Sequence, residues 1–204
     1  GTVHCGVRWM HFKELGGNAV FFSNYNRNSE VRGCHIEKIG GNGICFVGDP
    51  KAVRSPSFEY HESVASDNLD PFRGPKTTNY PADCRAHDNL IHDVGRVEKQ
   101  VAGVQISMAS GIQVTNNTIY RLPRAGINIS DGTWGGHEIA YNDVFDTVLE
   151  TGDHGAFNSW GRDRFWLADR KKMDSLVAAR PQMIFLDAVA VTRIHHNRFR
   201  CDHG

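Results

Sequence analysis

Gly111-Ile-Gln-Val-Thr-Asn-Asn-Thr-Ile-Tyr-Arg-Leu-Pro-Arg-Ala-Gly-Ile-Asn-Ile-Ser-Asp131 is the stretch of sequence that decides the fold. Apolar and polar residues alternate in two short segments of it, 112–119 and 126–130, and a polar turn joins them. Alternation with a period of two over four or five residues is typical of a short, half-buried β-strand. The stretch therefore predicts one coil of a stacked β-solenoid.

A six-residue signature of this kind recurs along the whole chain: apolar, two variable residues, a residue that is often Asn, another variable residue, apolar. Its copies are 7–12, 31–36, 86–91, 114–119, 139–144 and 194–199, and their last residues lie 24, 55, 28, 25 and 55 residues apart. Four copies have Asn at the fourth position, namely Asn89, Asn117, Asn142 and Asn197. An Asn amide can bond the backbone of its own turn and the next copy. We therefore expect an Asn ladder, although Asn is also a common turn residue.

A second signature follows the first five copies: a small residue, then alternating apolar positions, often ending in Ser. It occurs at 19–23, 43–47, 103–107, 126–130 and 155–159. Several short strands in each coil of about 25 residues, with no helical pattern between them, predict an all-β parallel β-helix of about six rungs. A β-sandwich is the alternative, but it would need hairpins with tight Asn-Gly or Asp-Gly turns.

Two segments, 48–82 and 161–188, account for the two long spacings. Each begins just past the second strand of its coil, so both should leave the stack at the same corner. The first is rich in proline and predicts an irregular loop, whereas 167–177 in the second predicts a short helix. Long structured insertions in a regular scaffold are usually functional. We expect these two to form the walls of a groove over the rungs between them.

The composition limits which partners, membrane segments and metal sites can be expected. The chain of 204 residues has 23 basic and 23 acidic residues, which gives no electrostatic reason to expect nucleic acid as a partner. No apolar run approaches the length of a membrane span. The five cysteines are widely spaced, so a zinc cluster is not expected. We expect a single β-helix domain, 1–204, cut from a longer protein that is secreted or periplasmic.

Chemistry is expected on the outward face of the second strands. Their alignment predicts an outward row of Cys45, Gln105, Asn128 and Phe157. Carboxylates, bases and tryptophans flank this row, a mixture that suits a poly- or oligosaccharide. The candidate catalytic carboxylates are Asp131, Asp153, Glu150 and Asp163. The candidate substrate-binding residues are Lys99, Gln105, Arg124, Asn128, Trp134, His137, His154, Trp160, Arg162 and Arg164.

Each candidate also has a structural interpretation. Asp131, Glu150 and Asp153 can be turn residues, the tryptophans can cover an apolar edge, and 162–164 can be a surface cluster of ion pairs. No cofactor and no metal is expected, because the adjacent His195 and His196 would point to opposite faces of a strand. His11, His35, His87 and His92 are interpreted as structural. Calcium is possible if the protein is a lyase.

The stretches 98–106, 123–129, 150–155 and 158–164 resemble bacterial secreted proteins of carbohydrate-degradation systems. As a whole, the chain resembles the right-handed parallel β-helix proteins of the pectate-lyase-like superfamily. Among characterised families it is most similar to glycoside hydrolase family 141, whose members include fucosidase and xylanase activities. The resemblance implies degradation of plant or microbial glycans. It transfers no catalytic aspartate to a particular position of this chain.

Three functions remain open at this point. A glycoside hydrolase would use two carboxyl groups, with Asp131 and Asp153 preferred and Glu150 and Asp163 in reserve. A separation of about 5 Å would favour retention of configuration, and about 6.5–9.5 Å would favour inversion. A polysaccharide lyase or epimerase acting on uronates would need a base such as Lys99, Arg124 or His154. A non-catalytic glycan-binding module would show aromatic residues without a close carboxylate pair.

Overall fold

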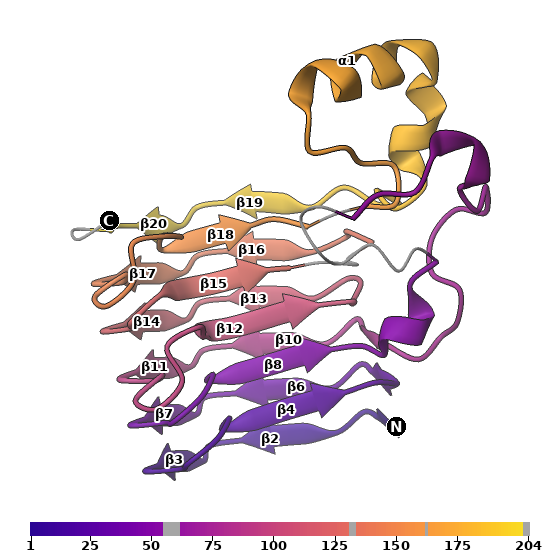
Figure 1. The fold of residues 1–204 in the computed structure, drawn as a ribbon. Helices are drawn as coiled ribbons and strands as arrows, with labels where there is room; N and C mark the ends of the chain where they lie inside the picture. The colour runs from indigo at the N-terminus through magenta and orange to yellow at the C-terminus, as the bar shows by residue number, and fades with distance from the viewer. Residues whose placement is uncertain (55–61, 131–133, 162, 202–204) are drawn as a thin grey trace.

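The computed structural model describes residues 1–54, 62–130, 134–161 and 163–201. Within them the chain winds into a parallel β-helix whose rungs stack from the N-terminal end to the C-terminal end (Figure 1). All the paired strands are parallel, as the predicted solenoid requires, and no hairpin of a β-sandwich occurs among them. The predicted all-β class is thus confirmed.

Three long sheets and one minor sheet form the walls. The minor sheet contains β1 (Thr2–Val3), β5 (Asn26–Arg27) and β9 (Pro81–Ala82). The first sheet contains β2 (Gly6–Arg8), β6 (Glu30–Arg32), β10 (Arg85–His87), β13 (Gln113–Thr115), β16 (Glu138–Ala140) and β19 (Arg193–His195). The second contains β3 (His11–Lys13), β7 (His35–Glu37), β11 (Leu90–His92), β14 (Thr118–Tyr120), β17 (Asp143–Phe145) and β20 (Arg198–Phe199). The third contains β4 (Val20–Ser23), β8 (Ile44–Val47), β12 (Ala102–Ser107), β15 (Ala125–Ile129) and β18 (Phe157–Ser159).

The six-residue signature spans the first and second sheets. Its first positions pair from Val7 through to Ile194, and its last positions pair from Phe12 through to Phe199. In the four central copies both apolar positions are fully buried. Burial of this repeated apolar pair in the central rungs is the main stabilisation of the stack, because a rung cannot bury its apolar face alone.

The corners between sheets use the left-handed backbone conformation. Asp83, Asp88 and Asp93 mark three corners of one rung with φ of 55°, 58° and 53°. Gly111, Asn116 and Arg121 mark the next, and Gly136, Tyr141 and Asp146 mark the one after it. A spacing of five residues is what a three-residue strand plus a two-residue corner requires. Asp and Asn tolerate this conformation better than most residues, which explains their frequency there.

The Asn ladder is present inside the stack. Asn89, Asn117, Asn142 and Asn197 each follow a left-handed corner, and each bonds the next one through side-chain amide and carbonyl groups. Each amide also donates to a backbone carbonyl of the preceding rung, at Val31, Ala86, Val114 and Ile139. The predicted buried role of these residues is therefore confirmed.

Both insertions leave the helix at the same corner, as predicted (Figure 1). The first carries two 3-10 helices, η1 (Pro50–Ala52) and η2 (Ser66–Asn68); the second carries α1 (Arg170–Ala179) and η3 (Pro181–Phe185). They contact each other directly, since Gly74 N donates to Leu186 O at 2.7 Å and Arg73 Nη2 donates to Val189 O at 2.7 Å. No helix in the described part of the chain is long and apolar enough to cross a membrane.

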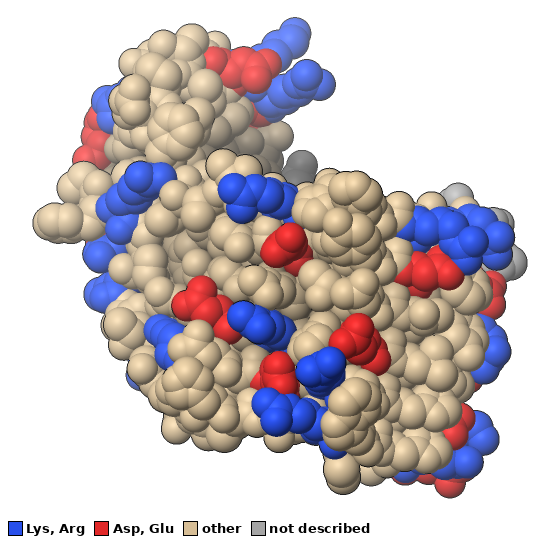
Figure 2. All heavy atoms as spheres, turned by 180° about the vertical axis from the view of Figure 1, so that it is seen from behind, with Lys and Arg blue, Asp and Glu red and all other residues tan. Residues whose placement is uncertain are grey.

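Figure 2 shows the charged side chains on one face of the molecule. On the face turned away from the viewer of Figure 1, basic and acidic side chains lie interspersed (Figure 2). Ion pairs also form between rungs, for example Arg8 with Glu30 and Arg198 with Asp143. This distribution matches the zero net charge of the sequence.

Candidate carbohydrate site

The outer face of the third sheet carries the predicted row, with one correction. The strand pairing aligns Phe21, Cys45, Gln105, Asn128 and Asn158. The predicted Phe157 instead pairs with Ile127 and packs against the core. The second signature aligns 155–159 with 126–130 and so places Ser159 opposite Ser130. The structure instead pairs Ser159 with Ile129, one residue away, because the apolar Phe157 has to point inward. Asn158, which the sequence interpretation missed, takes the outward position.

A network of amides runs along this row. Asn158 Nδ2 donates to Asn128 Oδ1 at 2.8 Å, and Asn128 Nδ2 donates to Gln105 Oε1 at 2.9 Å. Ser130 Oγ accepts from the amides of both Gln105 and Asn128, at 2.8 and 2.9 Å. Each amide is therefore fixed in orientation before any ligand binds, which lowers the entropy cost of recognition.

A pocket lies at the C-terminal end of these strands. Its volume is about 320 Å³ and its walls include Ser130, Ser159, Trp160 and Asp163. Ala188, Ala190 and Thr192 close its other side as the chain returns from the second insertion. Trp160 is 43% exposed, so part of its indole is open to solvent. Two predicted site residues, Trp160 and Asp163, are thus brought together here.

The N-terminal end of the same sheet holds a second group of candidates. Arg124 binds Asp153 through Nη2–Oδ2 at 3.0 Å and Nε–Oδ1 at 3.4 Å. The hydrogen bond from Arg124 lowers the pKa of Asp153, so this carboxyl group is ionised at neutral pH. His154 Nδ1 lies 2.9 Å from Asp153 Oδ2, and burial lowers the pKa of His154. Asp153 can act as a base or nucleophile in this state, but not as a general acid.

Lys99 and Glu150 form an ion pair at 2.9 Å in a different pocket. This pocket has a volume of about 470 Å³. Its charged lining residues are the basic Lys38, Arg96, Lys99 and Arg121 and the acidic Asp93 and Glu150. The lining is therefore predominantly basic, a feature that the balanced overall charge did not indicate.

The structure separates the two groups of carboxylates. β15 spans Ala125–Ile129, and a strand rises about 3.3 Å per residue, so its ends are roughly 13 Å apart. Asp153 contacts Arg124 just before this strand, whereas Asp163 shares a pocket with Ser130 just after it. Asp153 and Asp163 therefore do not form a catalytic pair with each other. Asp131 and Arg162 lie outside the described residues.

Trp134 and His137 are buried and do not face a ligand. Trp134 packs against Tyr80 with ring centroids 4.5 Å apart and the ring planes tilted by 55°. It also packs against Ala52 and Met108, between the first insertion and the rungs. His137 Nδ1 accepts a 3.0 Å hydrogen bond from Ile112 N, and burial lowers its pKa to about 4. Both predicted contacts with substrate need correction, because a large ring and a neutral imidazole fill interior positions here.

Arg164 is also buried, and its role is to join the two insertions. Its guanidinium pairs with buried Asp187, with Nε–Oδ1 at 3.1 Å, and donates to the carbonyls of Asp70, Phe72, Gly74 and Leu186. All of its hydrogen-bonding capacity is directed at protein atoms. The prediction that it binds substrate is therefore replaced by a structural role.

Comparisons with known proteins bear on the fold. No protein-family model matches the chain, and no curated protein matches it in sequence. Among solved structures it is similar to one described as "Glycoside hydrolase", with a TM-score of 0.58 and 17% identity. The match covers 74% of this chain and 24% of that chain, so this chain spans about a quarter of the length of the matched structure. At this identity the similarity supports the β-helix fold alone.

Proposed function

We propose that this protein is a β-helix glycoside hydrolase that binds a poly- or oligosaccharide along the outer face of the third sheet. One observation carries the proposal: the fixed amide row of Gln105, Asn128 and Asn158 leads to a pocket that contains Trp160 and Asp163. The fold of the matched glycoside hydrolase structure is consistent with this assignment.

Each part of this arrangement has a chemical role in the proposal. The indole of Trp160 stacks on the C–H face of one sugar ring. The amides of Gln105 and Asn158, oriented by the buried Asn128, bond hydroxyl groups of neighbouring rings. Asp163 is the first catalytic carboxyl group. A glycosidase needs a second one about 5–9.5 Å away. Asp131 follows Ser130 in the sequence and remains the candidate for that role, on sequence grounds alone.

Two narrower assignments are part of this proposal. The first is membership of a family similar to glycoside hydrolase family 141, which rests on the resemblance of the sequence. The second is a secreted or periplasmic location, because a polysaccharide substrate would be met outside the cytoplasm.

Incubation of the chain with a panel of glycans tests the activity. We expect new reducing ends with the wild type and a loss of at least roughly 100-fold with Asp163→Asn, since acid–base groups contribute about 10²–10⁴-fold. Asp143→Asn, on the second sheet and paired with Arg198, is the matched control and should retain activity. Trp160→Ala should raise KM more than it lowers kcat. Equal activity of the Asp163→Asn variant and the wild type would contradict the proposed role of Asp163.

The basic pocket supports a second candidate function, action on an acidic glycan. Four cations, Lys38, Arg96, Lys99 and Arg121, line it against two carboxylates. Such a lining can neutralise the carboxylate of a uronate, as a lyase or epimerase requires, with or without calcium. Absorbance near 235 nm from an unsaturated product would indicate a lyase. Binding measured by calorimetry without any product would identify a non-catalytic glycan-binding module.

A further inference from the structure

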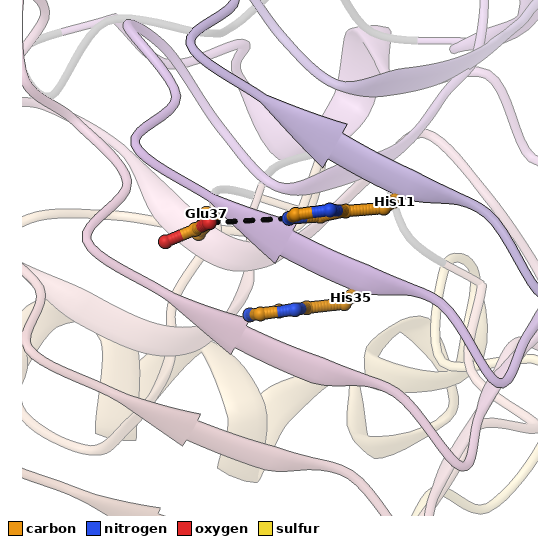
Figure 3. A group of neighbouring side chains, drawn as sticks. All are labelled: His11, His35 and Glu37. Atoms are coloured by element: carbon orange, nitrogen blue, oxygen red, sulfur yellow. Dashed lines mark hydrogen bonds and ion pairs between the residues drawn. The ribbon is translucent and has the colours of Figure 1, made fainter.

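Three potential metal ligands, His11, His35 and Glu37, meet on the outer face of the second sheet, and His92 lies next to His35. Strand pairing places His11 beside His35 and places Glu37 beside His92, on the three consecutive strands β3, β7 and β11. Figure 3 shows the rings of His11 and His35 lying parallel, with their nitrogen-bearing edges on the same side as the Glu37 carboxylate. Their ring centroids are 4.6 Å apart, close to the spacing of neighbouring strands.

The ligand atoms lie at distances that one ion can bridge. One atom each from His11, His35 and Glu37 falls within 4.8 Å of the other two. His11 Nε2 is 3.1 Å from Glu37 Oε1, and His35 Nε2 is 2.8 Å from His92 Nε2. Two ligand atoms on one tetrahedral zinc ion, each about 2.0–2.1 Å from it, are roughly 3.3 Å apart.

His92 is held in the orientation that metal-binding histidines usually have. Its Nδ1 lies 2.6 Å from Asp93 Oδ2, and Arg121 Nε in turn donates to Asp93 Oδ1 at 2.9 Å. Because a carboxylate only accepts, the proton of His92 sits on Nδ1, even though Arg121 Nη2 is also 3.2 Å from that nitrogen. The lone pair of Nε2 therefore points toward His35. Stacking on Tyr120, with centroids 4.8 Å apart, fixes the ring plane.

We propose that His11, His35 and Glu37 bind a divalent transition-metal ion of the zinc class, and that His92, whose Nε2 lies 2.8 Å from His35 Nε2, shifts to become the fourth ligand. Three imidazoles and one carboxylate form a set that suits zinc, whereas calcium and magnesium prefer oxygen ligands. The ion would cross-link three successive rungs. His11 is half-exposed, so its ring can turn to direct its lone pair at the ion.

Lys13 is a neighbouring charge that affects this site. Its Nζ is 3.5 Å from Glu37 Oε1 and competes with a cation for the carboxylate, but the lysine side chain is half-exposed and can move into solvent.

Zinc titration of the tag-free chain by calorimetry tests the site, with cobalt absorption spectra as a second readout. We expect one ion per chain and intense visible bands from tetrahedral cobalt. His11→Ala alters a half-exposed position on the edge strand β3, and Glu37→Gln keeps the size of the side chain, so neither need disturb folding. Each should weaken binding at least roughly 10-fold. Asp93→Asn should weaken it by a similar factor, through the orientation of His92. Lys13→Met should strengthen it.

The matched control is the other histidine pair of the chain, His195 and His196, whose Nδ1 atoms are 2.8 Å apart near the opposite end of the stack. The double substitution His195→Ala and His196→Ala should leave zinc affinity and the cobalt spectrum unchanged. The proposal is overturned if the wild type binds zinc no more tightly than His11→Ala, or if the control variant loses binding as much as His11→Ala does.

Discussion

The side-chain amide of Asn117 donates a 3.0 Å hydrogen bond to Oδ1 of Asn142, which lies at the same position of the next rung. Its own Oδ1 accepts from both the backbone N–H and the side-chain amide of Asn89, at 3.0 and 2.9 Å. Because these groups are buried, each unmade bond would carry a desolvation cost. The ladder thus sets the register between rungs as well as stabilising them.

Asn117→Ala should lower the free energy of unfolding by about 2–4 kcal/mol, because it removes the buried bonds that the backbone N–H of Asn89 and the carbonyl of Ala86 make to the Asn117 side chain. Urea unfolding followed by circular dichroism measures this. Asn18→Ala is the matched control, since the Oδ1 of Asn18 accepts two bonds from Asn42 at an exposed corner. The control should cost less than about 1 kcal/mol. Equal losses in both variants would show that burial of the ladder does not matter.

Gly126→Ala tests the row of small residues in the third sheet. Gly43, Gly103 and Gly126 align in the pairing of β8, β12 and β15. A Cβ on Gly126 would lie 2.2 Å from Val144 Cγ1 and 2.6 Å from Ala156 O, so the rung would have to shift. We expect a loss of about 1–3 kcal/mol in unfolding free energy. A Cβ on Gly152 meets nothing within 4 Å, so Gly152→Ala is the control and should be nearly neutral.

The sequence predicts the fold well because the fold follows from a short sequence pattern that repeats along the chain. The apolar positions from Val7 to Ile194 had to face one interior, and the period of their recurrence determined the parallel stacking. The sequence pattern misaligns β18, the last strand of the third sheet, because Ser159 resembles Ser130, while the inward residue is Phe157. The side chain that needs burial is therefore a better guide to register than the polar residue that follows it.

The candidate site could be predicted only in part, because its geometry depends on the insertions. Trp160 and Asp163 follow a strand directly, and the structure places them in one pocket. Trp134 and Arg164 are of residue types that are common in ligand-binding sites. They are buried here because residues of the first insertion contact them. Contacts between segments about 90 residues apart leave no signal in a local pattern. The cluster of His11, His35 and Glu37 was missed for a similar reason, since only strand pairing brings it together.

Acid should weaken the fold through Asp93. Hydrogen bonds from Arg121 lower the pKa of Asp93 from 3.8 to about 2. A group with a depressed folded pKa contributes stability that is present above its unfolded pKa and is lost as pH falls through the folded value. The contribution is on the order of 1 kcal/mol, because the side chain is 30% exposed and partly screened.

Urea unfolding in the presence of a chelator measures this effect. The difference in unfolding free energy between the wild type and Asp93→Asn should have its maximum value at pH 6. It should decrease between about pH 4 and pH 2. In an Arg121→Gln background, the difference in unfolding free energy caused by Asp93→Asn should change little with pH. A difference that stays constant from pH 6 to pH 2 would contradict the assignment to this pair.

Arg164→Leu should release the two insertions from each other. The substitution leaves the Asp187 carboxylate buried without its partner and removes bonds to the carbonyls of both segments, which costs about 3–5 kcal/mol when a buried pair is broken. Limited proteolysis should then cut within 161–188 well before the rungs unfold. Arg180→Ala is the matched control, because Arg180 pairs with exposed Asp67 between the same insertions and such a pair is worth about 0–1 kcal/mol. Equal protection of the Arg164→Leu variant and the wild type would show that other contacts hold the insertions together. Because the returning chain also closes the pocket of Trp160 and Asp163, loosening it should reduce glycan binding even though Arg164 touches no ligand.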